Sequence, residues 1–141
     1  EKKDRVDDAL HATKAALAEG IVPGGGIALL NASQKIEVKD DGYKILLEAI
    51  KAPYYIILEN AGYTEFPNPK EYVDNDPALE DREWEGVGID ATCGCYKSMV
   101  EHGIIDPVLV TKSALKNAIS VATTIVSTDC IISNVRSLES N

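Results

Sequence analysis

Three consecutive glycines at residues 24–26 follow Pro23 and interrupt an otherwise helical part of the chain. Glycine weakens a helix interior and proline cannot continue one, so a run of this kind forces a turn. Apolar residues recur at spacings of three and four over residues 4–19, which predicts a helix there. Gly20 is placed to end that helix in a left-handed conformation, and a second, short helix begins near Ile27.

Two further helices are predicted from capping residues and proline. Asp40 or Asp41 can cap a helix that continues through residues 43–51, because a side-chain oxygen at that position accepts a free backbone N–H. Pro53 favours the first turn of a separate helix, and Gly62 closes it.

The pair Asp106-Pro107 is the sharpest helix boundary in the chain. Aspartate is favoured as the capping residue and proline at the first helical position, for independent reasons. The sequence therefore predicts a helix from Pro107 to about Ser127. Its apolar residues share one face: Val110, Ala114, Leu115, Ala118, Val121, Ala122 and Ile125.

Residues 63–88 differ in character from the rest. They hold several prolines, and acidic side chains are concentrated between Glu71 and Glu85, where Trp84 is a large apolar residue. This composition predicts an acidic loop or insertion with little regular structure. Residues 87–93 can form a short strand that turns at Gly94, and residues 130–135 resemble a C-terminal strand. The fold class is therefore mainly α, with a short β-hairpin and a terminal strand.

The overall composition excludes some classes of protein. The chain has 141 residues, 45% of them hydrophobic, which is enough for one domain with a modest core. A net charge of −9 without a Lys/Arg cluster argues against nucleic-acid binding. No apolar run approaches the roughly 20 residues that cross a bilayer, so no membrane span is expected.

The cysteine content indicates no metal site. Cys93, Cys95 and Cys130 are the three cysteines, an odd and low number that does not describe a disulfide framework and suits a reducing compartment. Cys93 and Cys95 form the only close pair, and a zinc site would need a second pair. We expect all three to be structural residues, without a metal or redox role.

Three features could carry chemistry, and each has a purely structural alternative. Asp8 and His11 lie one turn apart on a helix and could support acid–base work, or could be surface residues favoured by the helix dipole. The glycines at residues 24–26 precede a helix and could approach a phosphate, or could only make a turn; they do not fit the G-x-G-x-x-G pattern. Asp106 is explained by capping alone.

Taken together and in order, these segments resemble group I chaperonins, the bacterial GroEL type and its mitochondrial and plastid relatives. The similarity covers nearly the whole chain apart from residues 63–88. The motifs that carry it are RVDDALHATKAA at residues 5–16, EGIVPGGG at 19–26, KAP at 51–53, ENAG at 59–62, GIIDP at 103–107 and VTKSAL at 110–115.

The resemblance implies that residues 1–141 form the C-terminal portion of a chaperonin equatorial domain, a multihelical ATPase domain. The parent would be an ATP-dependent molecular chaperone subunit that assists protein folding in a homo-oligomeric, heptameric ring with a co-chaperonin. Its unfolded clients would bind an apical domain outside this chain, and residues 130–135 would pair with the adjacent subunit. The implied compartment is the mitochondrial matrix, a plastid or the bacterial cytoplasm.

The resemblance also assigns roles to individual residues. Asp8 matches the carboxylate that positions and activates the water attacking the γ-phosphate of ATP, a reaction that depends mostly on positioning and electrostatics. Asp106 matches the carboxylate that hydrogen-bonds the ribose hydroxyls. The other matching positions contact the nucleotide through the glycine turn or line the adenine: Gly24, Gly25, Gly26, Asp90, Ala91 and Ile104.

The cofactor implied is ATP or ADP with Mg²⁺, whose main protein ligand lies in the family's N-terminal half. The 141-residue chain alone is therefore not expected to hydrolyse ATP. Asp90 stands where many members have Asn, and Tyr55 and Thr64 stand where familiar members have charged ring-contact residues, which leaves the number of rings open. The alternatives are a non-hydrolysing structural paralogue and an unrelated helical enzyme that uses Asp8 and His11.

Overall fold

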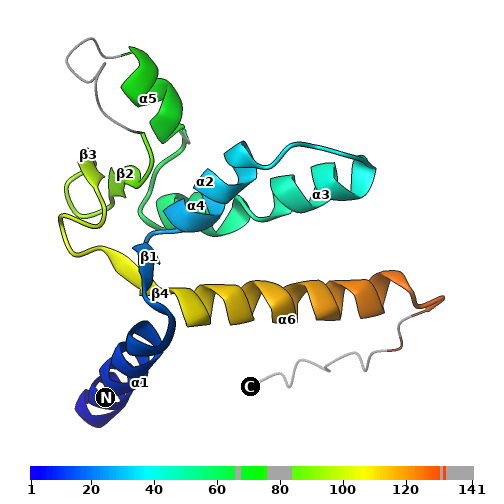
Figure 1. Ribbon diagram of the computed structural model, residues 1–141, viewed down its shortest axis with the longest axis horizontal. Helices are drawn as coiled ribbons and strands as arrows, with labels where there is room; N and C mark the ends of the chain where they lie inside the picture. Colours follow the sequence, from blue (N-terminus) through cyan, green and yellow to red (C-terminus); the bar gives the residue numbers. More distant parts are fainter. Residues whose placement is uncertain (66–67, 76–83, 131, 133–141) are drawn as a thin grey trace, which may run out of the picture.

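The computed structural model describes residues 1–65, 68–75, 84–130 and 132, and within them the chain is mainly helical, as predicted (Figure 1). The helices are α1 (Lys2–Glu19), α2 (Ile27–Lys35), α3 (Asp41–Ala49), α4 (Ala52–Asn60), α5 (Pro69–Asn75) and α6 (Val108–Val126). The strands are β1 (Ile21–Pro23), β2 (Val87–Asp90), β3 (Cys95–Ser98) and β4 (Ile105–Pro107). None of the helices within these ranges is long and apolar enough to cross a membrane.

The strands form two antiparallel pairs. β2 and β3 make the predicted hairpin, with Val87 opposite Ser98 and Asp90 opposite Cys95, and the chain turns through Gly94 at a φ of +73°. The second pair joins β1 to β4 and was not predicted. It brings the segment after α1 against the segment before α6, so two segments far apart in the sequence meet at a short stretch of sheet.

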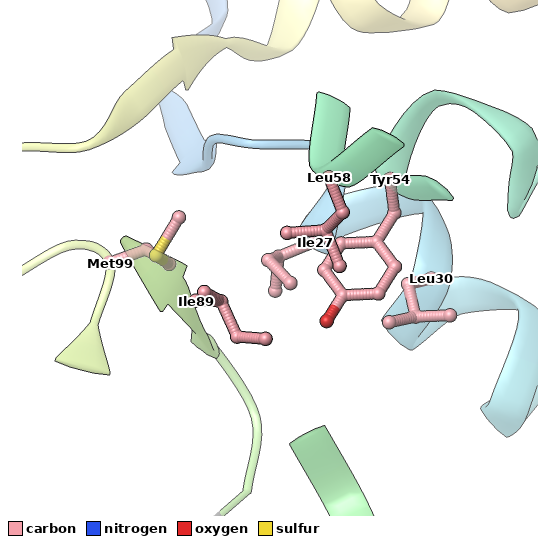
Figure 2. Packing of buried hydrophobic residues seen from close by; sticks show 6 residues of the cluster. All are labelled: Ile27, Leu30, Tyr54, Leu58, Ile89 and Met99. Atoms are coloured by element: carbon pink, nitrogen blue, oxygen red, sulfur yellow. The ribbon is translucent and has the colours of Figure 1, made fainter. Parts of the chain in front are cut away.

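The core lies where α2, α4 and the β2–β3 hairpin meet (Figure 2). Its buried members are Ile27, Leu30, Tyr54, Leu58, Ile89 and Met99. A Cβ added to Gly88 would lie 2.6 Å from Cγ1 of Ile27, so the hairpin backbone packs directly on the side chain that begins α2. This cluster fixes the hairpin relative to the glycine turn at residues 24–26, which immediately precedes Ile27.

Helices α1 and α6 extend away from this core (Figure 1). Neither helix has a buried residue, although both carry apolar side chains. The predicted apolar face of α6 is present but uncovered: Val110, Val121 and Ile125 are exposed. A large apolar face left in water indicates surface that normally packs against another element.

The helix ends differ from the sequence predictions at two places. Asp40 caps α3 as predicted, with its Oδ1 accepting the Tyr43 N–H at 3.0 Å. Asp106 does not cap α6, since the capping position is Pro107 and Asp106 lies in β4. The physical reason is the strand pairing, which holds Asp106 extended opposite Val22. Gly20 ends α1, but at φ +86° and ψ −167°, because the chain enters β1 directly and needs an extended conformation there.

The prediction of little regular structure at residues 63–88 was wrong in part. Helix α5 occupies Pro69–Asn75, and Asn68 supplies its first hydrogen bond by accepting the Lys70 N–H at 3.0 Å. Tyr72 of α5 stacks on Tyr96 of β3 with ring centroids 3.7 Å apart, which ties the helix to the hairpin. Asn followed by Pro is a helix-start signal, so a proline in this region begins a helix as well as interrupting one. Residues 76–83 lie outside the described part.

Two further predictions concern the cysteines and the C-terminus. Cys93 and Cys95 are joined by a disulfide in the structure, which the low and odd number of cysteines did not predict. Their spacing across one glycine in a tight turn brings their Cα atoms to 5.4 Å, within bonding range. Cys130 is free and exposed. The expected strand at residues 130–135 falls largely outside the described residues.

Candidate functional site

The glycine turn is fixed by a backbone contact with the segment before β4. The Gly24 N–H donates to the Ile104 carbonyl oxygen at 2.9 Å, and the Gly24 carbonyl accepts the Ile27 N–H at 3.2 Å. A Cβ on Gly24 would lie 3.1 Å from both the carbonyl carbon and oxygen of Ile104. Only glycine lets the two backbones approach this closely, so two predicted site residues, Gly24 and Ile104, are brought into direct contact.

The next two glycines have left-handed φ values. Gly25 has φ +66° and Gly26 has φ +78°, and Gly26 is the N-terminal capping residue of α2. A Cβ on Gly26 would lie 2.6 Å from the backbone nitrogen of Tyr54 in α4. The turn therefore lies between α4 and the start of α2, where the helix dipole favours an anion.

Asp106 joins this region through the β1–β4 pair. It lies opposite Val22, one residue before Pro23 and the glycine turn, and its side chain is exposed. Ile104, two residues earlier, donates its N–H to the Met99 carbonyl at 2.8 Å. The predicted phosphate-side glycines at residues 24–26 follow β1, whereas Ile104 and Asp106, predicted for the base and the ribose, lie at β4. The β1–β4 pair thus holds together two segments that are distant in the sequence.

Asp90 lies at the end of β2 as the centre of a hydrogen-bonded turn. Its Oδ2 accepts from Lys97 Nζ at 2.8 Å, and its Oδ1 accepts from the Thr92 hydroxyl at 2.6 Å and the Thr92 N–H at 2.9 Å. These hydrogen bonds, the one from Lys97 foremost, hold the pKa of the Asp90 carboxyl well below its usual range. The carboxylate is therefore ionised and internally satisfied, and Ala91 beside it is exposed.

Asp8 is not brought to the other candidate residues. It lies on the exposed helix α1, together with Asp7 and His11. Gly20 lies twelve positions after Asp8, a distance of about 18 Å along the helix axis at the usual rise. Within the described residues, no group of three or more His, Cys, Asp or Glu side chains is placed to hold a metal ion.

An apolar groove beside the glycine turn was missed from the sequence. It has a volume of about 1020 Å³ and runs between α6 on one side and α3 and α4 on the other. Pro23, Gly26 and Asp106 are among its lining residues. Apolar residues such as Ile45, Ile57 and Val126 line it, and Ile45 is 70% exposed. The apolar face predicted for the helix at residues 107–127 was the sequence signal that could have indicated this groove.

Comparison with known proteins identifies the class to which this fold belongs. The model of the TCP-1/cpn60 chaperonin family matches residues 1–136. The chain therefore belongs to the TCP-1/cpn60 chaperonin family, and its fold resembles the chaperonin equatorial domain.

A solved relative supports the same assignment. The chain is similar to a protein described as a group III chaperonin in the open state, with 28% sequence identity and a TM-score of 0.63. The match covers 84% of this chain and 25% of that chaperonin. This chain thus spans about a quarter of the length of the chaperonin that it matches.

Proposed function

We propose that this chain is the C-terminal part of the equatorial, ATP-binding domain of a group I chaperonin subunit. The complete subunit would couple ATP hydrolysis to protein folding in a heptameric ring that works with a co-chaperonin. The chaperonin family match over residues 1–136 supports the class. The motifs that resemble group I members support the type, while the solved relative belongs to group III.

The observation that carries the proposal is the contact between the glycine turn and Ile104. A nucleotide site needs backbone close to the ligand and a hydroxyl-binding carboxylate nearby. The Gly24–Ile104 hydrogen bond and the β1–β4 pair place the start of α2 beside exposed Asp106. Gly25 and Gly26 would contact the phosphate side, and Asp106 would accept hydrogen bonds from the ribose hydroxyls.

The base would lie toward the β2–β3 hairpin. Ile104 and Ala91 supply apolar contacts there, and the Asp90 carboxylate forms the turn that presents Ala91. Because both Asp90 oxygens already accept hydrogen bonds, we expect Asp90 to shape this part of the pocket and not to bind the base amino group directly.

Hydrolysis would require more than the described site. ATP brings Mg²⁺, which neutralises the phosphate charge, and the described residues supply no ligand cluster for it. Asp8 would orient the attacking water, but it lies on α1 at a distance from the glycine turn. We therefore propose that α1 moves toward the turn in the complete subunit, and that the 141-residue chain alone does not hydrolyse ATP.

The apolar groove fits the same proposal. A groove of about 1020 Å³ with a mostly apolar lining is left uncovered beside the site, and exposed apolar surface of this kind usually packs against a partner. We propose that the remaining part of the parent's equatorial domain fills it. Ile45→Ser would then lower the free energy of unfolding of the complete subunit by about 1.5–3 kcal/mol, but would change that of the 141-residue chain little. Equal effects in both would contradict this.

The decisive test is ATP turnover by the complete subunit carrying Asp8→Ala, with Asp7→Ala as the matched control. Both variants remove one carboxylate from adjacent exposed positions of α1. We expect Asp8→Ala to lower turnover by about 10²–10⁴-fold with nucleotide binding retained, the usual effect of losing one positioned acid–base group. Asp7→Ala should stay near wild type.

The outcomes separate the candidate functions. Equal loss in both variants, or in neither, would contradict the role of Asp8. No turnover by the wild-type subunit, with nucleotide still bound, would favour the non-hydrolysing structural paralogue. Native mass spectrometry of the assembled wild type tests the ring, for which we expect seven subunits or a multiple of seven.

A further inference from the structure

The turn between β2 and β3, which follows the predicted site residues Asp90 and Ala91, is closed by a disulfide. Cys93 and Cys95 are bonded to each other across Gly94, and both are exposed. The same turn carries Asp90, whose carbonyl accepts the N–H of Cys93 at 3.1 Å and of Gly94 at 2.8 Å. The covalent link therefore closes the turn that shapes Asp90 and presents Ala91.

This turn packs against the main body of the domain. A Cβ on Gly94 would lie 2.8 Å from the hydroxyl oxygen of Tyr63, and φ at Gly94 is +73°. Tyr63 packs against the core cluster and donates its N–H to the Leu58 carbonyl at 3.0 Å, at the end of α4. Near the other end of α4, Tyr54 contacts Gly26 of the glycine turn. A series of contacts through α4 thus joins the turn that holds the disulfide to the glycine turn at residues 24–26.

We propose that Cys93 and Cys95 form a thiol–disulfide exchange site whose redox state controls the turn carrying Asp90, and through it nucleotide affinity. The substrates are thiols: exposed disulfides are open to attack by a thiolate, and a covalent link in a short turn restricts its backbone. The effect on nucleotide rests on the proposed function, whereas the exchange reaction and the change in the turn do not.

The exchange step balances with a low-molecular-weight thiol as reductant. One thiolate attacks a sulfur of the disulfide, the Cys93–Cys95 bond breaks, and the released cysteine thiolate takes up a proton. A second thiolate attacks the resulting mixed disulfide and releases the other protein thiol. The net change is two electrons and two protons to the protein, with two small thiols oxidised to one disulfide.

The test uses the complete subunit in buffers of reduced and oxidised glutathione. Alkylation followed by mass spectrometry gives the fraction of Cys93–Cys95 disulfide, and amide hydrogen exchange reports the turn. We expect the pair to interconvert across the series, and exchange at residues 92–95 to be about tenfold faster when reduced, because local opening becomes easier. ADP affinity should change by about fivefold or more, the lower range of allosteric couplings.

Two variants sharpen the test. The double variant Cys93→Ser/Cys95→Ser has no thiol in the turn, so it forms neither the disulfide nor a mixed disulfide with glutathione there and should match the reduced wild type in every buffer. Cys130→Ser removes the other cysteine, which is free and exposed, and should leave the redox response intact. A loss of the response in Cys130→Ser would overturn the assignment to Cys93 and Cys95.

The results also distinguish this inference from the proposed function. A pair that stays reduced throughout, or one that is oxidised without any change in amide exchange at the turn, overturns the inference. ADP binding that is identical in both redox states overturns its effect on the pocket while the proposed function stands. Absence of ADP binding in every state contradicts the proposed function, and the exchange site is then judged on alkylation and amide exchange.

Discussion

Replacing Gly26 by Ala tests the packing of the glycine turn most directly. The residue has φ +78°, and a Cβ there would lie 2.6 Å from the nitrogen and 2.7 Å from the Cα of Tyr54. Both atoms belong to the backbone of α4, which cannot rotate aside as a flexible side chain would. Relief therefore requires α2 and α4 to separate, and these helices carry most of the core.

The expected cost has two parts. A left-handed conformation costs an alanine about 1–2 kcal/mol, and overpacking against a fixed neighbour adds about 1–3 kcal/mol. Gly103 supplies the matched control, because its φ is +72° and a Cβ there meets nothing within 4 Å. Gly103→Ala should therefore carry only the first part, so the two variants should differ by about 1–3 kcal/mol.

Urea unfolding of the 141-residue chain followed by circular dichroism measures this difference. At a slope of about 2 kcal/mol per molar urea, it corresponds to about 0.5–1.5 M between the two midpoints. If Gly26→Ala is unfolded even without urea while Gly103→Ala is folded, that result would also agree with the close packing of α4 on the turn. Equal midpoints for the two variants would refute the close approach of α4 to the turn.

Three further outcomes follow from single contacts. Lys97→Met removes the hydrogen bond that most lowers the Asp90 pKa, so that pKa should rise toward its ordinary value in an NMR titration. Because the Asp90 pKa is lower in the folded than in the unfolded state, ionised Asp90 stabilises the fold at pH values above its unfolded pKa. In the wild type this stabilisation is lost as the pH falls through the folded pKa. In Lys97→Met the folded pKa is higher, so the same loss should occur at a higher pH. Lys112→Met breaks an ion pair with Glu19, but should change the free energy of unfolding by less than about 1 kcal/mol, because the two side chains are 62% and 32% exposed. Leu58→Ala should lower it by about 2–5 kcal/mol, because Leu58 is 1% exposed in the core; a loss below 1 kcal/mol in urea unfolding would contradict that burial.

Local signals in the sequence were sufficient for most of the helices. Capping by Asp40, the turn at residues 24–26 and the hairpin at Gly94 each depend on the conformational preference of one or two residues. Such preferences operate whatever the rest of the chain does, which is why those predictions were confirmed.

The errors arose where a distant segment decides the conformation. Asp106 has the side chain and the following proline of a helix cap, yet pairing with Val22 holds it in a strand. Gly20 could have closed α1 in a left-handed turn, but the chain continues into the same strand pair. No local pattern marks three-residue strands, so β1 and β4 could not be predicted.

In the candidate site, too, some features depend on local sequence and others on contacts with distant segments. The glycine turn was identified from its own sequence, whereas its contact with Ile104 depends on the β1–β4 pairing. The roles assigned to Asp8, Asp90 and Asp106 came from the family resemblance. What the structure adds is their placement: Asp106 close to the turn, Asp90 engaged by Lys97 and Thr92, and Asp8 on a separate helix.

The pairing of β1 with β4 also bears on how the chain folds. All of residues 24–104 lies between the two strands, so their pairing closes a long loop. Closing a loop of that size costs about 4 kcal/mol of chain entropy, whereas a helix forms from neighbours within microseconds. We expect the helices and the hairpin to form first and the Gly24–Ile104 contact to form last, an order that pulse-labelled hydrogen exchange at the Gly24 amide would time. Formation of the contact between the glycine turn and Ile104 would then be the slow step in the folding of this domain.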